Sequence, residues 1–439
     1  MHSESPQSPD KHATYARKRL AFLIVGLIAL FCIGVINAWS ILVEPISNQT
    51  GWSTQSMSNT YRILIITYCL GCLASSIIQG RCNGNPRPPL FIGAVLILIG
   101  LAAPAALANR GSDAVMLSYG VIAGLGMGFG FNAILTTVNL WFPDRLGFVS
   151  GIQMFAFCAG PLILGTPIDS LMNTIGWQAS FVGMGLVFAG SSIAAAIVAW
   201  KPPIDIHEVF AAKSTSQSVV GRRGNPLDFA ISARSFTAAE ALRSKVFWIG
   251  LAWFLAIATV CVTLIGESKQ DAMTLGMSSG LATLLAGLVA VGEGVSGIVY
   301  GMVVDRFGIA NLIKATTWIS IVATGVIALS FFTGSWIMFF AGALLLTLGY
   351  GGLPVFSATF SLNRFGRKHY STIYAISTSW LIAGSMLGMF VTPIFSSISP
   401  AYDGLLSMYA GLFALIAASA VIMIAFIKVY RNDMRKLIE

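Results

Sequence analysis

The sequence predicts an all-α membrane protein with twelve transmembrane helices, arranged as two similar six-helix halves. Of the 439 residues, 56% are hydrophobic and only 10% are charged, whereas soluble proteins carry about 25% charged residues. The apolar residues form runs of about 20 or more, which is the length that spans the hydrocarbon core of a bilayer. Within such runs the backbone must be helical, because lipid offers no hydrogen-bond partner to its polar groups.

The predicted spans follow one another through short loops, with one long polar interruption in the middle. They are residues 20–44, 59–80, 90–109, 114–141, 148–170 and 179–200, then 246–266, 277–304, 311–332, 335–361, 370–398 and 404–428. This pattern predicts a tail at 1–19, a bundle at 20–200, a linker at 201–245, a second bundle at 246–428 and a tail at 429–439. We expect the linker to be solvated, with a short surface helix near Thr237–Leu242.

The basic residues predict the orientation of the chain in the membrane. The side that holds both termini carries 23 Lys and Arg residues, and the other side carries three, Arg62, Arg110 and Lys269. Cytoplasmic loops are enriched in Lys and Arg, so we predict a multi-pass protein of the plasma membrane with both termini in the cytoplasm. This bias accounts for the net charge of +9, so no nucleic-acid partner is predicted. The basic residues of the linker could also contact anionic lipid.

The two halves resemble each other at matching turns. Gly80 near the end of the second span corresponds to Gly301 in the eighth, at an offset of 221 residues. Arg145 after the fourth span corresponds to Arg364 after the tenth, at an offset of 219 residues. Two nearly equal offsets indicate a duplicated six-helix unit, and parallel repeats with a binding site near the midplane are a transporter architecture.

The turn after the eighth span has the pattern Gly301-x-x-x-Asp305-Arg306-Phe307-Gly308. The first glycine permits close helix approach, the last permits a tight reversal, and the acid near a helix end can accept hydrogen bonds or pair with a cation. The pattern resembles the signature loop of the major facilitator superfamily, in which it holds one conformation. We therefore expect a conformational latch formed by Gly301, Asp305, Arg306 and Gly308 together with Asp144 and Arg145 after the fourth span.

Further motifs accompany this turn. They are Ala38-Trp39-Ser40-Ile41-Leu42-Val43-Glu44-Pro45 with Gly51-Trp52-Ser53, Trp141-Phe142-Pro143-Asp144-Arg145 with Gly147, and Phe365-Gly366 with Lys368-His369 and Tyr374. They resemble the oxalate/formate antiporter family, of which the monocarboxylate transporters are cousins, over nearly the whole membrane portion. The resemblance implies the major facilitator fold and the transport of small carboxylates, by exchange or together with protons.

Glu293 is the one charged residue that lies deep inside a predicted span. An ionisable side chain near the bilayer midplane is costly and usually functional. An apolar environment favours the protonated form of a carboxyl group, so Glu293 is suited to take up and release a proton. Two alternatives remain open: it pairs with a cationic substrate, or it is a structural group bracketed by Gly292 and Gly294.

The resemblance also implies two cations that this chain lacks. Oxalate-type members place an Arg eight residues before the acid of the turn and a Lys in the eleventh span, and these positions here are Gly297 and Trp380. A buried dianion without a cation would carry a large desolvation cost, so oxalate is not the expected substrate. Glu293 lies one helical turn before Gly297 and is expected to face the same central cavity. Trp380 is expected to replace the cationic clamp, with Tyr374 on the opposite side of that helix.

Several other side chains are candidates to line the cavity, with helix packing as an equal alternative for each. They are Asn37, Trp39, Asn132, Gln153 and, near the outer end of the second span, Arg62. Arg62 reaches either the lipid headgroups or the outer vestibule. Glu267, Lys269 and Asp271 are expected to be solvated in an outer loop. Gly120, Gly124 and Gly128 recur every four residues and predict a close-packed helix face.

The sequence has no Walker loop, no Ser/His/Asp set and no metal-site spacing among its six cysteines, so we predict neither an enzyme nor a cofactor or metal. We predict a secondary active transporter that moves a small organic acid by alternating access, coupled to protons or to exchange, and acts as a monomer. The alternative is a transporter or exporter of a cationic or neutral aromatic molecule, with Glu293 as its counter-charge.

Overall fold

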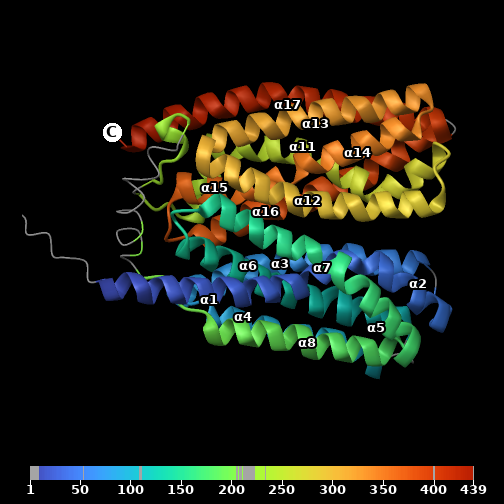
Figure 1. The fold of residues 1–439 in the computed structure, drawn as a ribbon, viewed down its shortest axis with the longest axis horizontal. Helices are drawn as coiled ribbons and strands as arrows, with labels where there is room; N and C mark the ends of the chain where they lie inside the picture. Colours follow the sequence, from blue (N-terminus) through green and yellow to red (C-terminus); the bar gives the residue numbers. More distant parts are fainter. Residues whose placement is uncertain are drawn as a thin grey trace, which may run out of the picture. The chain divides into compact units, whose positions relative to one another are not determined.

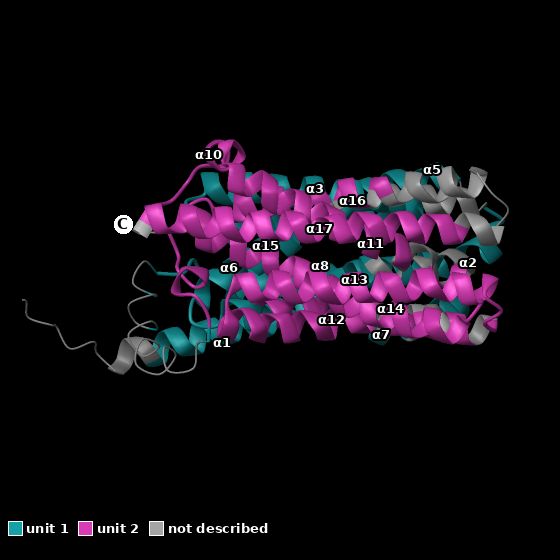
Figure 2. Ribbon diagram, turned by 90° about the horizontal axis from the view of Figure 1, so that it is seen from above, with its two compact units in different colours: residues 1–149, 163–223 teal, residues 150–162, 224–439 magenta. Residues whose placement is uncertain are grey.

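The computed structural model describes residues 9–52, 54–107, 111–203, 206, 210, 223–232, 234–398 and 401–438. Over these ranges the chain forms helices joined by short turns, without strands. It divides into two compact units, residues 1–149 with 163–223 and residues 150–162 with 224–439 (Figure 2). Helix α7, Leu146–Ile175, contributes to both units.

Unit 1 is a bundle of helices (Figure 1). They are α1 (Pro9–Ile33), α2 (Trp39–Thr50), α3 (Thr54–Arg81), α4 (Arg87–Ala106), α5 (Ser112–Val115), α6 (Gly124–Trp141) and α8 (Trp177–Val198). The first predicted span is broken by a 3-10 turn at Gly34–Ala38, after which α2 continues beyond the predicted end. The fourth begins as α5, passes through a π-helical stretch at Met116–Ala123 and continues as α6.

Unit 2 contains the remaining helices of the described chain. They are α10 (Ala238–Arg243), α11 (Lys245–Thr274), α12 (Ser279–Phe307), α13 (Ile309–Thr333), α14 (Trp336–Tyr350), α15 (Gly352–Phe365), α16 (Tyr370–Ile398) and α17 (Ala401–Ile438). Within this unit α11 packs against α16 and α17, and α13 packs against α14 and α17. The tenth predicted span is divided at Gly351, where α14 ends and α15 begins.

Among the described residues, eleven helical segments are long and apolar enough to cross a membrane. They correspond to eleven of the predicted spans, and the 29-residue helix α16 occupies the remaining one at 370–398. The prediction of an all-α, multi-pass membrane protein is confirmed. The predicted close-packed glycine face is confirmed as well. A Cβ atom on Gly120, Gly124 or Gly128 would lie only 2.0–3.3 Å from carbonyl oxygens of α3.

In the second part of the predicted linker, some backbone groups bind to unit 2 instead of to water. Residues 224–232 and 234–237, which we call the strap, bind the turn between α15 and α16. The Ser232 amide donates to the Asn363 carbonyl at 2.8 Å, and the Phe236 amide donates to the Phe365 carbonyl at 2.9 Å. The expectation of a solvated linker is wrong at Ser232 and Phe236, because these two amides are satisfied by the α15–α16 turn rather than by water.

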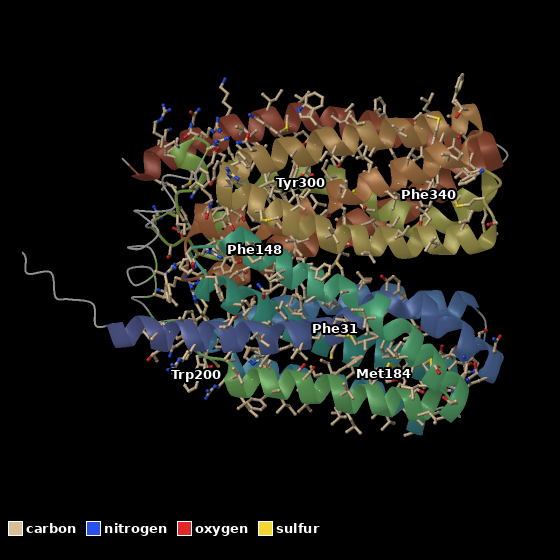
Figure 3. All side chains as sticks on the ribbon, in the orientation of Figure 1. Phe31, Phe148, Met184, Trp200, Tyr300 and Phe340 are labelled. Atoms are coloured by element: carbon tan, nitrogen blue, oxygen red, sulfur yellow. The ribbon has the colours of Figure 1, made fainter. Side chains whose placement is uncertain are left out.

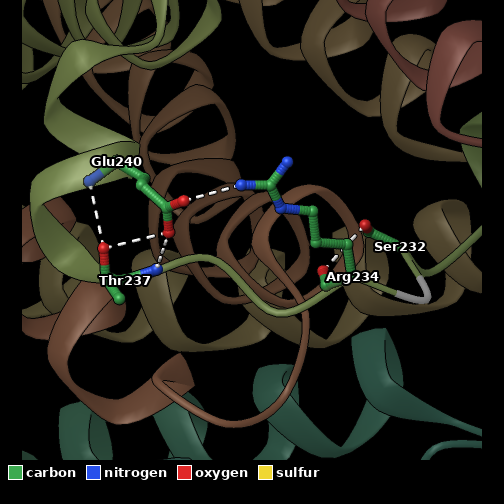
Figure 4. Close-up of polar contacts among 4 residues, drawn as sticks. All are labelled: Ser232, Arg234, Thr237 and Glu240. Atoms are coloured by element: carbon green, nitrogen blue, oxygen red, sulfur yellow. Dashed lines mark hydrogen bonds and ion pairs between the residues drawn. The ribbon is translucent and has the colours of Figure 1, made fainter.

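The strap ends at the short helix α10, which confirms the predicted surface helix. Thr237 and Glu240 form a capping box: the Thr237 hydroxyl accepts from the Glu240 amide, and the Glu240 carboxylate accepts from the Thr237 amide. Arg234 pairs with the same carboxylate at 2.7 Å, while Ser232 donates to the Arg234 carbonyl (Figure 4). Two of the free amides at the start of the helix are thereby satisfied.

The expectation that Asp271 is solvated is also wrong. Helix α11 continues to Thr274, two turns beyond the predicted end of that span, and Asp271 is 2% exposed. The Tyr409 hydroxyl of α17 donates to its carboxylate at 2.6 Å. A partner on a neighbouring helix therefore allows this acid to be buried, which sequence spacing alone does not reveal. The side chains of Glu267 and Lys269 lie outside the described residues.

Candidate solute and coupling site

Glu293 lies in the second half of α12, where three helices of unit 2 meet. The Cys158 thiol of α7 is hydrogen-bonded to the Glu293 carboxyl group, and Cys261 of α11 is close enough to interact with it electrostatically. Glu293 itself is half-buried, whereas both cysteines are buried. Among the described side chains, the carboxyl group thus has thiol neighbours and no ion-pair partner.

Glycines bring the neighbouring backbones into contact with α12 around this carboxyl group. A Cβ atom on Gly151 of α7 would lie 2.3 Å from the Gly297 carbonyl oxygen. One on Gly351, at the break between α14 and α15, would lie 2.7 Å from the Glu293 carbonyl oxygen. Ser296 adds a hydrogen bond to the Thr347 carbonyl at 3.1 Å. The backbone that carries Glu293 is therefore held by close contacts with two other helices.

Gly297, where the resemblance implies an arginine, is part of this packing. A Cβ atom placed there would lie 3.6 Å from the Gly151 carbonyl oxygen and 3.8 Å from the Gly351 carbonyl oxygen. The position therefore faces α7 and the α14–α15 break within unit 2, where a Cβ atom would make ordinary van der Waals contacts. In this chain the position supplies no positive charge.

Trp380 packs against the beginning of α11. Its ring packs edge-on against Trp248 of α11, with the ring centroids 5.5 Å apart. Trp248 lies near the start of α11, 13 residues before Cys261, whereas Gly384, four residues after Trp380, faces Ala258, three residues before Cys261. Tyr374, buried on α16, packs against Tyr370 at 6.0 Å. The structure therefore brings Glu293 together with Cys158 and Cys261, and Trp380 together with Trp248.

The other candidate side chains are divided between the units. Asn132 is buried on α6 of unit 1, and Gln153 is buried on the part of α7 that belongs to unit 2. The backbones of Asn37, Trp39 and Arg62 are helical, but their side chains lie outside the described residues. Tyr300 lies two turns beyond Glu293 on α12 (Figure 3). It is also buried, and it is not among the residues predicted to line the cavity.

The turn expected to form the latch supports the strap. Gly308 joins α12 to α13 with φ +83° and ψ 169°, a conformation available essentially to glycine alone. A Cβ atom there would lie 2.6 Å from the Asp228 Cβ atom of the strap. Gly301 is buried, Asp305 is half-buried and Arg306 is exposed. The glycine at 308 thus serves both the reversal of the chain and the approach of the strap.

The corresponding turn of unit 1 uses its charges differently. Asp144 pairs with Arg19 of α1 at 2.9 Å, and Arg145 is exposed. Arg364, the residue matched to Arg145 by the repeat, is instead 5% exposed and pairs with Asp433 of α17 at 2.6 Å. Trp200 lies at the same end of unit 1 (Figure 3). Lys18 and Arg87 both lie over its ring.

Sequence reasoning missed the ion pairs that involve the end of α17. The prediction ended this helix at residue 428 and treated 429–439 as a tail, but α17 continues to Ile438. Arg431 and Asp433 therefore stand on an ordered helix, where they pair with Asp228 and Arg364. The interspersed acidic and basic residues of this segment are typical of a solvated helix and were the available signal.

The fold and this site define a polytopic membrane protein of the transporter class: glycine-packed helices surround one acid in the middle of a span. The sequence profile described as Major Facilitator Superfamily matches residues 22–268, more than half of the chain. The chain therefore belongs to the major facilitator superfamily, whose members are membrane transporters rather than enzymes.

Curated relatives lie within the same superfamily. The chain is similar to the oxalate:formate antiporter of Oxalobacter formigenes, with 24% identity over 65% of this chain and 64% of the antiporter. It is 26% identical to the uncharacterized MFS-type transporter YhjX of Escherichia coli (strain K12) over 82% of this chain and 85% of that protein. It is 28% identical to monocarboxylate transporter 2 of Rattus norvegicus over 36% of this chain and 30% of that transporter.

Solved structures support the fold. The structure of the proton:xylose symporter XylE bound to 6-bromo-6-deoxy-D-glucose is similar with a TM-score of 0.65 and 17% identity, over 94% of this chain and 96% of that one. The likeness confirms the fold predicted from the sequence.

Proposed function

We propose that this protein is a secondary active transporter of a small organic acid, driven by protons or by exchange. The similarity to an oxalate:formate antiporter and to a monocarboxylate transporter supports this class of solute. A monocarboxylate, or a carboxylic acid carried in its neutral form, suits a site in which Gly297 and Trp380 replace the cations implied by the resemblance, since a dianion would lack compensation for its desolvation.

The observation that carries the proposal is the environment of Glu293. Its carboxyl group is half-buried in the middle of a predicted span and contacts a neutral thiol, with no ion pair among the described residues. A carboxyl group in such surroundings exchanges protons without breaking a salt bridge. We propose that Glu293 carries the coupling proton and that the close contacts of α12 keep it in place when the protein changes conformation.

Transport assays with Glu293→Gln protein test the proposal. In proteoliposomes with an imposed pH gradient, the wild-type protein is expected to accumulate a carboxylate such as formate. The variant is expected to lose this accumulation and to retain exchange against internal carboxylate, because glutamine has a similar shape but does not titrate. Glu240→Gln is the matched control, since it makes the same chemical change outside the predicted spans. Proton-driven uptake at the wild-type rate in Glu293→Gln protein would refute the proposed role.

The second candidate is a carrier or exporter of a cationic or neutral aromatic solute. The absence of an ion-pair partner for Glu293 in the described structure favours it, because a bound cation would then be the counter-charge. Competition by matched carboxylates and amines separates the two candidates. Inhibition of uptake by amines alone, abolished in Glu293→Gln protein, supports the second candidate and excludes the first.

We further propose that the protein is a monomer of the plasma membrane with both termini in the cytoplasm, and that Gly301, Asp305, Arg306, Gly308, Asp144 and Arg145 stabilise one conformation. The distribution of basic residues supports the orientation. Labelling of single cysteines introduced at the strap and at Gly276 in sealed vesicles tests the orientation directly. We expect the strap cysteine to be protected from an impermeant reagent in right-side-out vesicles.

A further inference from the structure

A basic cavity of about 450 Å³ lies at the end of unit 2 where α11 begins and α17 ends. Five cationic and two acidic side chains line it, and the cations are Arg234, Arg243, Lys245, Arg364 and Lys436. The two acids are already paired, Glu240 with Arg234 and Asp433 with Arg364. The cavity therefore has a surplus of positive charge from Arg243, Lys245 and Lys436.

Two features of the wall favour an anion. Arg364 is 5% exposed, and its Nε atom is bound to Asp433, while its buried Nη1 atom has no hydrogen-bond partner among the described residues. Ser244, Lys245 and Val246, at the start of the 30-residue helix α11, also line the cavity. The free amides and the dipole of a long helix favour negative charge at its N-terminus. An anionic oxygen that reaches Arg364 would provide the missing acceptor.

A separate apolar groove of about 410 Å³ lies beside this cavity along the same two helices. Trp248, Ile249 and Ala252 of α11 form one side, and Val421, Ile422 and Ala425 of α17 form the other. Val246 and Val429 of the cavity are three and four residues from Ile249 and Ala425, which is about 5 Å along each axis. Trp248 is 47% exposed and Val421 is 69% exposed, so the groove is open on the outside of the unit.

We propose that the cavity and groove together bind an anionic phospholipid, with the headgroup phosphate among the cations and an acyl chain between α11 and α17. A basic cavity alone fits any phosphate, and an apolar groove alone fits any chain. Their adjacent placement, about one helical turn apart on one helix pair of a membrane-spanning unit, matches an amphipathic ligand that has both parts. The inference concerns a site other than Glu293 and does not depend on the transported solute.

Native mass spectrometry of the full-length protein with phosphatidylglycerol and phosphatidylcholine tests the proposal. We expect tighter binding of phosphatidylglycerol. The variant R243Q/K436Q should bind it about 30-fold more weakly, from about a fivefold loss for each cation. The variant K428Q/R435Q is the matched control, because it removes two exposed cations of α17 that do not line the cavity. Phosphatidylglycerol binding that falls equally in both variants would overturn the proposal.

Ala425→Trp distinguishes a phospholipid from a soluble phosphate. Ala425 is exposed in the groove, so a tryptophan there fills the groove without crowding the core. We expect this variant to lose affinity for phosphatidylglycerol and to leave any binding of inorganic phosphate unchanged. Wild-type affinity of Ala425→Trp protein for phosphatidylglycerol, together with displacement of the lipid by inorganic phosphate, would overturn the lipid assignment in favour of a soluble anion.

Discussion

Arg431 donates two hydrogen bonds to the Asp228 carboxylate, at 3.0 and 2.7 Å, and joins α17 to a strap residue that is 203 positions away. The Asp228 side chain is fully buried, whereas that of Arg431 is 31% exposed. The pair is therefore asymmetric. Removal of the arginine leaves a buried charge without compensation, whereas removal of the carboxylate leaves a cation that water can reach.

This asymmetry predicts that Arg431→Met destabilises the protein more than Asp228→Asn. Loss of one partner of a buried pair costs roughly 3–5 kcal/mol, so we expect Arg431→Met to lower the free energy of unfolding by about 3 kcal/mol. Asp228→Asn should cost less, because the amide is neutral and still accepts a hydrogen bond. Denaturant titration in detergent measures both, with Arg435→Met as the exposed control. Equal losses would show that the carboxylate is not effectively desolvated.

A comparison of Gly308→Ala with Gly111→Ala separates the stability lost to backbone strain from the stability lost to a clash with the strap. The two glycines have almost the same backbone conformation, φ +83° and ψ 169° against φ 82° and ψ −173°. A Cβ atom at 308 would meet Asp228, whereas at 111 it would meet nothing within 4 Å. Each alanine carries strain of about 1–3 kcal/mol, and we expect the larger fall in melting temperature for Gly308→Ala. Its double mutant with Arg431→Met should be less than additive, because both changes loosen the strap.

A second pair of glycine variants tests the contact between α7 and α12. The Cβ atom of Gly151→Ala would lie 2.3 Å from a backbone oxygen, so the helices must separate. We expect a loss of about 1–3 kcal/mol, as in other overpacked interiors. Gly287→Ala, on α12 with open space around it, should instead raise stability by about 0.5–1 kcal/mol. If Gly151→Ala unfolds at the wild-type temperature, the close contact does not hold the two helices.

The capping box at α10 predicts a dependence on pH. Hydrogen bonds from the Thr237 amide and hydroxyl, and then from Arg234, hold the pKa of Glu240 below its usual range. A lowered pKa in the folded state means that the carboxylate stabilises α10 above the usual carboxyl range, and that this contribution is lost as the pH falls through the lowered pKa. We expect Glu240→Gln to speed hydrogen exchange in α10 at pH 7, with no difference from wild type in acid. Thr237→Val, which removes the N-cap hydroxyl, should speed exchange at both pH values.

The sequence predicted the features of the fold that depend on composition and local pattern. Long apolar runs are sufficient to identify spanning helices, and the regular glycines at 120, 124 and 128 identify a close-packed face. The predicted positions were wrong where polar groups find partners far along the chain. Asp271 is buried because of Tyr409, and the strap is ordered because of Asn363, Phe365 and Arg431. Such pairings join residues more than a hundred positions apart, so no local pattern reveals them.

The candidate site was predictable in part. Glu293 was predicted because a charged residue is rare inside a span. The structure adds Cys158 as its hydrogen-bond partner. Residue type alone does not distinguish this cysteine from one that only packs. Trp380 was selected by alignment with an implied family position, and its contact with Trp248 depends on how α16 lies against α11. Sequence spacing fixes which residues of one helix share a face. The neighbouring helix that this face meets is set by tertiary packing.

The division of α7 between the units has a consequence for synthesis of the protein. Gly151 lies in a segment that belongs to unit 2, and its contact Gly297 is made 146 residues later. At about 5–20 residues per second, the ribosome needs roughly 7–30 seconds to make that intervening stretch. During this time the segment 150–162 is in the membrane without its final neighbours. Biogenesis of the second bundle thus depends on a segment inserted with the first, and a chain interrupted between residues 203 and 223 should assemble only when both fragments are made together.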